Sequence, residues 1–170
     1  MRDTLKISGI LFSGIFTAAF LYPFLHETGH SLAAFAVGAE VKEFNLYPLP
    51  SVLCNIGALD NYEIVLIGLG GILLPFLSVA FVQPKGFWIS YIIFVMRGIC
   101  LLSFLISFIS IIMFYNGGEI ADDDMTKILQ IDSSNSLLYA SILIVLFILT
   151  SILIAKSHPL RKCYKYFEIS

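Results

Sequence analysis

Residues 7–38 read ISGILFSGIFTAAFLYPFLHETGHSLAAFAVG, an apolar run whose only acidic or imidazole side chains are His26, Glu27 and His30. A helix rises about 1.5 Å per residue, so about 20 residues cross a hydrocarbon core of roughly 30 Å. A helix also satisfies its own backbone hydrogen bonds, which an isolated strand does not do in lipid. The run therefore predicts a membrane-spanning helix with a polar cluster in its second half.

The rest of the chain has the same apolar character. Of its 170 residues, 58% are hydrophobic and 13% are charged, whereas an ordinary soluble domain has about 25% charged residues. Three more stretches are long and apolar enough to cross a bilayer, namely 64–83, 86–115 and 133–155. We therefore predict an all-α integral membrane protein, a single domain over residues 1–170 with about four transmembrane helices and the lipid bilayer as its surroundings.

The basic residues indicate how these spans are oriented. Four spans place both termini on one side of the membrane. That side then carries seven lysines and arginines, against two on the other side, Lys42 and Lys127. Because basic residues concentrate on the cytoplasmic side, we expect both termini, including the basic tail 156–170, to be cytoplasmic. A cleaved signal peptide is the alternative at the N-terminus, but the apolar run is long and continues directly into the polar cluster.

Charge and cysteine spacing exclude two classes of function. The formal net charge is −2, so no general basic field supports a nucleic-acid partner, and none is expected. Cys54, Cys100 and Cys163 lie far apart and form no CxxC pair. Neither a disulfide framework nor a cysteine zinc site is therefore predicted.

Two segments between the spans carry their own signals. Alternation of apolar and polar residues over Val41–Leu46 predicts a short strand, and a β-hairpin or interfacial segment, between the first and second spans. Lys42–Leu46 could be an edge strand to which an extended substrate adds, or a plain interfacial hairpin. Between the third and fourth spans, a turn at Asn116–Glu119 precedes the acidic cluster Asp122–Asp124 and a short helical pattern over Met125–Ile131.

The polar cluster of the first span has the HExxH spacing of zinc metalloproteases. Residues four apart lie on one face of a helix, so His26 and His30 can bind one metal ion while Glu27 takes a proton from a water on that metal. Three histidines and six glutamates would produce this spacing by random placement in roughly one sequence in a thousand. The alternative is a set of polar residues that bond between helices without metal. Pro23 is expected to kink the helix before the motif and to admit water.

A catalytic zinc site needs a third protein ligand and an open position for water. His158 falls in the cytoplasmic tail, on the wrong side for this role. The cluster Asp122–Asp124 falls on the same side as the two motif histidines. Asp124 is favoured, since it directly precedes the helical segment and a carboxylate at a helix start is oriented and stabilised. Asp123 is the close alternative, and a solvated capping turn is the alternative for the whole cluster.

Weaker signals come from Arg97 and from a group of small residues. Arg97 lies well inside the third span and is predicted to extend toward the cytoplasmic side, or else to pair with an acidic group near the site. Gly68, Gly70 and Gly71, followed by Pro75, are predicted to permit close helix packing. A substrate gate is the alternative for these residues.

The sequence resembles the site-2 protease family of intramembrane zinc metalloproteases, especially its small microbial branch. The likeness rests on the motif 26–30 in a membrane helix, the turn Gly38-Ala39-Glu40-Val41, the run Gly70-Gly71-Ile72-Leu73-Leu74-Pro75 and a late aspartate. Members of the family often hold that aspartate in an Asn-Pro-x-x-Asp-Gly setting. This chain instead has Asn116-Gly117-Gly118, and no glycine follows Asp124.

The resemblance implies that His26 and His30 bind Zn²⁺, that Glu27 is the catalytic acid and base, and that an aspartate of 122–124 is the third ligand. It also implies cleavage of another protein within or beside its membrane span, in a microbial plasma membrane. One alternative is a prenyl-protein type of membrane zinc protease, with Glu119 as third ligand. Another is a catalytically silent membrane protein that binds metal, against which Glu27 argues because a structural site needs no acid or base.

Overall fold

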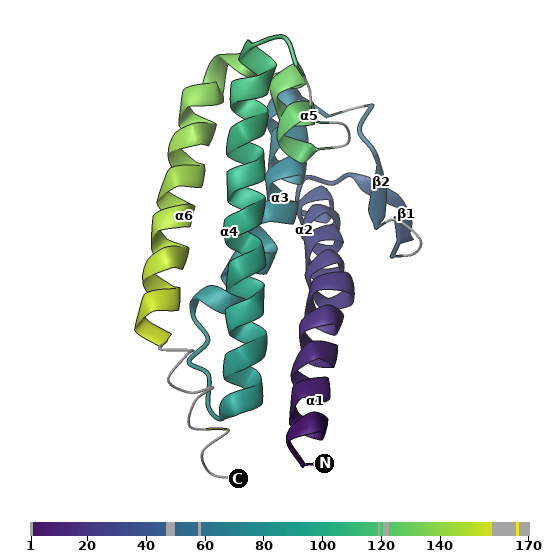
Figure 1. Cartoon of the computed structure of the whole chain (residues 1–170). Coiled ribbons are helices and arrows are strands. Elements are labelled where there is room, and N and C mark those ends of the chain that lie inside the picture. Colours follow the sequence, from purple (N-terminus) through teal and green to yellow (C-terminus); the bar gives the residue numbers. More distant parts are fainter. Residues whose placement is uncertain are drawn as a thin grey trace.

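The computed structural model describes residues 2–46, 50–57, 59–118, 120, 123–157 and 166. Its elements are α1 (Arg2–Phe16), η1 (Thr17–Leu21), α2 (Tyr22–Ala36), β1 (Glu40–Asn45), β2 (Ser51–Asn55), α3 (Asn61–Ala80), α4 (Phe87–Tyr115), α5 (Asp124–Ile131), η2 (Ser133–Asn135) and α6 (Ser136–Ser157). Within the described residues, four helical segments are long and apolar enough to cross a membrane. They are Thr4–Ala36, Asn61–Ala80, Phe87–Tyr115 and Ser133–Ser157. The predicted helical fold with a small hairpin is confirmed at this level (Figure 1).

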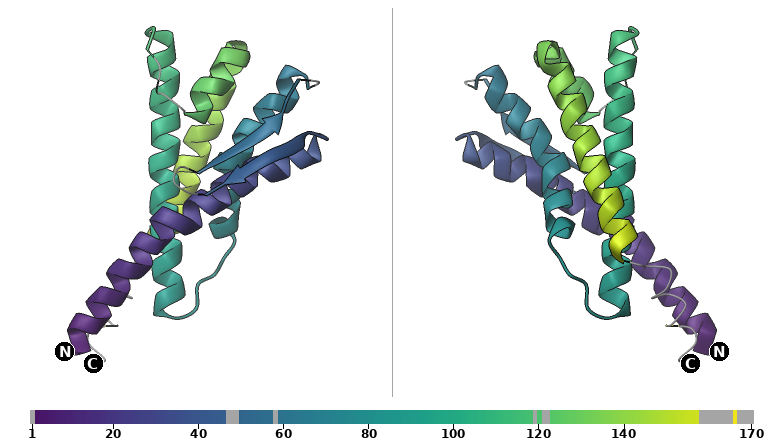
Figure 2. Two further views of the ribbon diagram at one scale, coloured as in Figure 1. Left: turned by 90° about the vertical axis from the view of Figure 1, so that its right-hand side faces the viewer. Right: turned by 90° about the vertical axis from the view of Figure 1, so that its left-hand side faces the viewer.

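The first apolar segment is one long helix with an irregular turn in the middle. Between α1 and α2, η1 is a π-helical turn, and the backbone N–H of Tyr22 bonds to the carbonyl of Thr17, five residues back. Pro23 follows in the first turn of α2 and has no N–H to donate to a carbonyl of the turn before it. The helix changes direction at this turn (Figure 2). The kink expected from Pro23 therefore takes the form of a π-helical turn, a known cause of helix bending.

The predicted bounds of the second span, 64–83, need correction because the helix begins and ends three residues earlier. The side chain of Asp60 accepts a hydrogen bond from the Glu63 backbone at 2.9 Å, and the Glu63 side chain accepts one from the Asp60 backbone at 3.0 Å. This reciprocal pair is a capping box, which starts a helix. Charged residues assigned to the connecting segment thus form the first turn of α3. The first span ends at Ala36 rather than 38, and Gly38 adopts a positive φ of 77°.

Glycines bring α2 and α3 into contact along their backbones. A Cβ built on Gly29 would collide with the backbone of Gly70, and one built on Gly70 would lie 2.5 Å from the carbonyl oxygen of Gly29. Any larger side chain at these two positions would therefore force the helices apart. The close packing predicted for this glycine group is present, and it fixes the motif helix directly against α3.

The short helix α5 is anchored by its apolar face. Met125, Ile128 and Leu129 are at most 2% exposed, and they join a core formed mainly by α3, α4 and α6. The predicted helix at 125–131 is thus present, beginning one residue earlier at Asp124. Burial of these three apolar side chains holds α5 against α3 and α4.

Arg97 of α4 is buried, and its guanidinium extends toward the ends of α3 and α6 that are predicted to be cytoplasmic. It is 3% exposed, and its guanidinium donates hydrogen bonds to backbone carbonyls of Val79, Val82 and Leu153. Val79 lies in the last turn of α3, where carbonyls lack partners within the helix, and Val82 lies just beyond the end of α3. The structure gives Arg97 carbonyl partners in place of the acidic partner considered from the sequence. Arg97 therefore joins α3, α4 and α6 at the end far from the motif.

The predicted strand is present and is the first strand of a hairpin. Strands β1 and β2 pair antiparallel, with Glu40 opposite Asn55 and Asn45 opposite Ser51, and the register shifts between Val41 and Glu43. The hairpin runs back along α2 (Figure 2), and the ring of Phe44 on β1 contacts that of Phe24 in the first turn of α2. It is thereby placed next to the polar cluster of the first span.

Candidate metal centre

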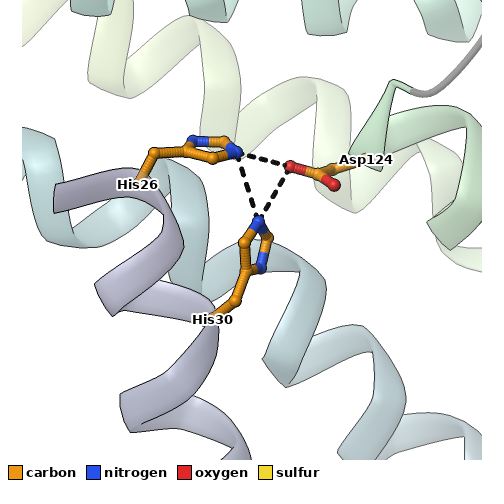
Figure 3. A group of neighbouring side chains, drawn as sticks. All are labelled: His26, His30 and Asp124. Atoms are coloured by element: carbon orange, nitrogen blue, oxygen red, sulfur yellow. Dashed lines mark hydrogen bonds and ion pairs between the residues drawn. The ribbon is translucent and has the colours of Figure 1, made fainter. Parts of the chain in front are cut away.

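The two motif histidines point to one spot on the face of α2 (Figure 3). Their Nε2 atoms lie 3.2 Å apart. One carboxylate oxygen of Asp124, from the first turn of α5, lies 3.0 Å from Nε2 of His26 and 3.1 Å from Nε2 of His30. Within the described part of the chain, these three residues are the group whose ligand atoms converge closely enough to hold a metal ion.

A backbone carbonyl fixes the orientation of His30. Its Nδ1 lies 2.8 Å from the carbonyl oxygen of Ile67 on α3, and a carbonyl can only accept, so Nδ1 carries the proton. In the neutral imidazole the other nitrogen, Nε2, then carries a lone pair. That lone pair faces the carboxylate of Asp124 and the imidazole of His26. The arrangement brings electron-pair donors together, and a shared cation would satisfy them.

The spacing of these atoms fits zinc. A tetrahedral zinc ion with ligand bonds of about 2.0–2.1 Å separates its ligand atoms by roughly 3.3 Å. The three separations here are 3.0, 3.1 and 3.2 Å. Two imidazoles and one carboxylate are also a ligand set of catalytic zinc sites, where a fourth position stays open. The residues present therefore fit the metal that the HExxH spacing predicts.

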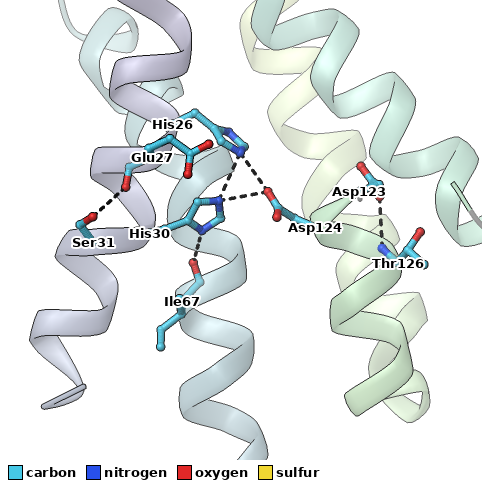
Figure 4. Close-up of polar contacts among 8 residues, drawn as sticks. All are labelled: His26, Glu27, His30, Ser31, Ile67, Asp123, Asp124 and Thr126. Atoms are coloured by element: carbon cyan, nitrogen blue, oxygen red, sulfur yellow. Dashed lines mark hydrogen bonds and ion pairs between the residues drawn. The ribbon is translucent and has the colours of Figure 1, made fainter. Parts of the chain in front are cut away.

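The structure separates the roles of the neighbouring aspartates (Figure 4). Asp123, rather than Asp124, is the N-cap of α5, and its carboxylate accepts a hydrogen bond from the Thr126 backbone at 3.1 Å. Asp124 is the first helical residue, and its side chain points to the histidines. Asp124, which the sequence favoured as the third ligand, is the aspartate that lies against the histidines, whereas the cap of the helix is its neighbour. Asp122, Glu119 and His158, also considered from the sequence, lie outside the described residues.

Glu27 lies beside the two imidazoles (Figure 4). Its side chain is largely buried, with 7% of the residue exposed, and it lines the same groove as His26, His30 and Asp124. A carboxylate in this position can exchange protons with a water that lies among the three ligand atoms. The predicted catalytic residue is therefore next to the candidate metal site.

A groove of about 720 Å³ opens onto the three ligand atoms. One of its walls is β2, and the others come from α3 and α5. Its lining residues outside the polar cluster are Pro50, Ser51, Val52, Leu53, Cys54, Ile56, Ile64, Ile67, Gly68, Lys127, Ile128 and Ile131. Partial burial raises the pKa of the Cys54 thiol in this wall. Among the described lining residues none belongs to β1, so the strand beside the site is β2 and not Lys42–Leu46.

Several site residues had no specific signal in the sequence. Ile67 acts through its backbone carbonyl, and every residue has one, so its contact with His30 could not be read from residue type. The position of β2 follows from the pairing of the hairpin. Gly71 belonged to a recognised small-residue group, yet its contact with the imidazoles depends on the register between α2 and α3.

Gly71 offers a test of that register. A Cβ built at this position would collide with the His30 imidazole and would lie 2.9 Å from Cε1 of His26. We expect Gly71→Ala to weaken zinc binding by about 10–100-fold, because displaced ligands cost this much in known sites. Zinc affinity of the purified protein is the measurement. Gly98→Ala is the matched control, since a Cβ there meets no atom within 4 Å, and equal affinity of the two variants would contradict the prediction.

Comparison with known proteins adds no assignment: no family model, curated protein or solved structure matches this chain.

Proposed function

We propose that this chain is a zinc-dependent intramembrane endopeptidase, as its resemblance to the site-2 protease family implies. The observation that carries the proposal is the convergence of two imidazole nitrogens and one carboxylate oxygen within 3.2 Å of one another, beside the buried Glu27. His26, His30 and Asp124 would hold the metal. Zinc, when bound, supplies a Lewis acid that polarises the scissile carbonyl and acidifies water.

Glu27 performs the proton transfers of the proposed reaction. Its carboxylate removes a proton from the attacking water as the water oxygen bonds to the carbonyl carbon of the substrate. The same group then gives this proton to the amide nitrogen as the carbon–nitrogen bond breaks. Water is consumed, and one acid and one amine are released. Burial in the groove keeps Glu27 close to both positions and limits access of bulk water.

The proposed reaction takes place below the membrane surface. His26 lies about 15 Å by helical rise from the end of the first span at Ala36. Ionisable groups at membrane depth are costly and are a mark of function. The substrate is proposed to be a membrane protein whose chain is extended across the groove, with β2 as the neighbouring strand. The chain is proposed to be a multi-pass protein with cytoplasmic termini, an orientation supported by the distribution of basic residues, and the family resemblance favours a microbial plasma membrane.

A silent metal-binding protein is the main competing function. Its ligands would be the same, so zinc content alone does not separate the two. Glu27 distinguishes the protease from the silent metal-binding protein, since a site that only binds metal has no use for a buried fourth ionisable group. A prenyl-protein type of protease would draw its third ligand from Glu119, whereas Asp124 already lies within 3.1 Å of both histidines.

The test uses the full chain reconstituted in lipid vesicles with a set of single-span reporter proteins. We expect cleavage within or beside the reporter span, loss of cleavage with 1,10-phenanthroline, and recovery on addition of Zn²⁺ but not Mg²⁺, which prefers oxygen ligands. Mass spectrometry of the fragments locates the cut. Cleavage that persists after complete removal of zinc would contradict the proposal. A protein that binds zinc, yet cuts none of the reporters under any condition, would favour the silent binder.

A further inference from the structure

The two motif imidazoles are held in different ways. His30 is oriented by a hydrogen bond from Nδ1 to the carbonyl of Ile67. The corresponding Nδ1 atom of His26 is buried and has no hydrogen-bond partner among the described residues. Metal-binding histidines usually donate from their second nitrogen to an outer partner, which fixes the ring plane. His26 must therefore obtain its orientation from something else.

Tyr22 lies against the ring of His26. The two ring centroids are 6.0 Å apart and the ring planes meet at 28°, which is a stacked arrangement. Tyr22 is four residues before His26 and shares its face of α2. Its ring is itself restrained, since it packs against the core cluster formed mainly by α3, α4 and α6.

The origin of this restraint lies in the backbone just before the motif. Tyr22 follows the π-helical turn η1 directly, and its own N–H makes the five-residue hydrogen bond to Thr17. A π-helical turn adds a residue to the helix and so rotates everything that follows relative to what precedes it. The irregular turn therefore lies directly before the residue that packs against the core cluster and stacks on His26.

We propose that Tyr22 is a positioning residue that sets the ring plane of His26 for metal binding. The inference rests on the proposed function, because it assumes that His26 is a metal ligand. Without an outer hydrogen bond, the imidazole of His26 can rotate about its bond to Cβ, and Nε2 then leaves the common point of the three ligand atoms. The flat face of Tyr22 blocks that rotation on one side. The stacked ring provides the restraint, and the phenol hydroxyl is not needed for it.

The experiment compares Tyr22→Leu, which removes the ring, with Tyr22→Phe, which keeps it. Zinc affinity is measured by competition with a chelating dye, and the cobalt-substituted proteins are compared by visible absorption, which reports ligand geometry. We expect Tyr22→Leu to raise the Kd for zinc by about 10–100-fold and to alter the cobalt spectrum. Tyr22→Phe is expected to stay within about threefold of the original protein, with an unchanged spectrum. Tyr62→Leu, at an exposed tyrosine of α3, is the control for loss of a tyrosine.

Several outcomes would overturn the inference. Equal zinc affinity of Tyr22→Leu and the original protein would do so, as would equal losses in the leucine and phenylalanine variants, which would assign the effect to the hydroxyl. Thermal unfolding of the metal-free proteins identifies a variant that fails to fold, and Tyr22→Met then carries the same expectation as leucine. An original protein that binds no zinc overturns the proposed function together with this inference, whereas zinc binding that is indifferent to the ring at position 22 overturns the inference alone.

Discussion

Replacing Glu27 with glutamine is expected to lower cleavage by at least about 10²–10⁴-fold, the usual contribution of a general acid–base group. Glutamine has nearly the same shape but does not take a proton from water at neutral pH. Glu27 is not one of the three groups whose ligand atoms converge, so bound zinc should be unchanged. The variant is expected to be an inactive protein with an intact metal site.

Glu63→Gln is the matched control for this prediction. Glu63 lies at the exposed start of α3, where it belongs to the capping box with Asp60, so its replacement should affect only the local helix start. Cleavage of a reporter span and zinc content are measured on the same preparations. Full activity of Glu27→Gln would show that Glu27 takes no part in the reaction. Loss of both cleavage and bound zinc in this variant would instead identify Glu27 as a metal ligand.

The second large effect concerns metal content. The original protein is expected to contain about one zinc ion per chain, as a single site of three ligands binds. His26→Ala, His30→Ala and Asp124→Ala should each reduce zinc to background levels. Each removes one of three ligand atoms that lie within 3.2 Å of the others, and the two that remain hold zinc weakly. Elemental analysis after purification in detergent is the measurement.

Asp123→Ala is the sharpest control, because it changes the adjacent carboxylate. Asp123 caps α5 through the Thr126 backbone, so its loss should cost about 1 kcal/mol of stability, as for other N-caps, and leave zinc in place. The reverse result, in which Asp123→Ala loses zinc and Asp124→Ala keeps it, would mean that the start of α5 is rotated relative to the arrangement described here. Loss of zinc in neither aspartate variant would point to a ligand outside the described residues.

Elements with a periodic signal could be predicted from the sequence alone. The apolar spans, the hairpin strand and the short helix at 125–131 all follow from the spacing of apolar residues, which depends only on local geometry. The motif histidines belong to this group too, because residues four apart on a helix meet wherever the helix lies. The proximity of Asp124 to the motif could also be predicted, since consecutive spans were expected to alternate in direction, which brings the segment after the third span to the motif end of the first.

Features that depend on contact between distant elements could not be predicted in this way. The burial of Arg97 against carbonyl groups required the C-terminal ends of α3 and α6 to meet α4 at one level. The start of α3 was misplaced because charged residues read as a connection, although Asp60 and Glu63 form a capping box. The position of β2 at the groove could not be predicted either, since alternation identifies a strand but not which elements it faces.

The contact between Gly29 and Gly70 has a consequence for how this sequence can vary. The HExxH pattern leaves its third and fourth positions free, and Thr28 at the third has its hydroxyl bonded within its own helix, to the carbonyl of Phe24. The fourth position is different in this chain, since a Cβ on Gly29 would enter the backbone of α3. Metal chemistry does not constrain the residue at position 29, but the packing of α3 restricts it to glycine. Substitutions at residues 29 and 70 are therefore coupled. A change at one of them is tolerated only together with a change at the other that keeps the distance between the two helices the same.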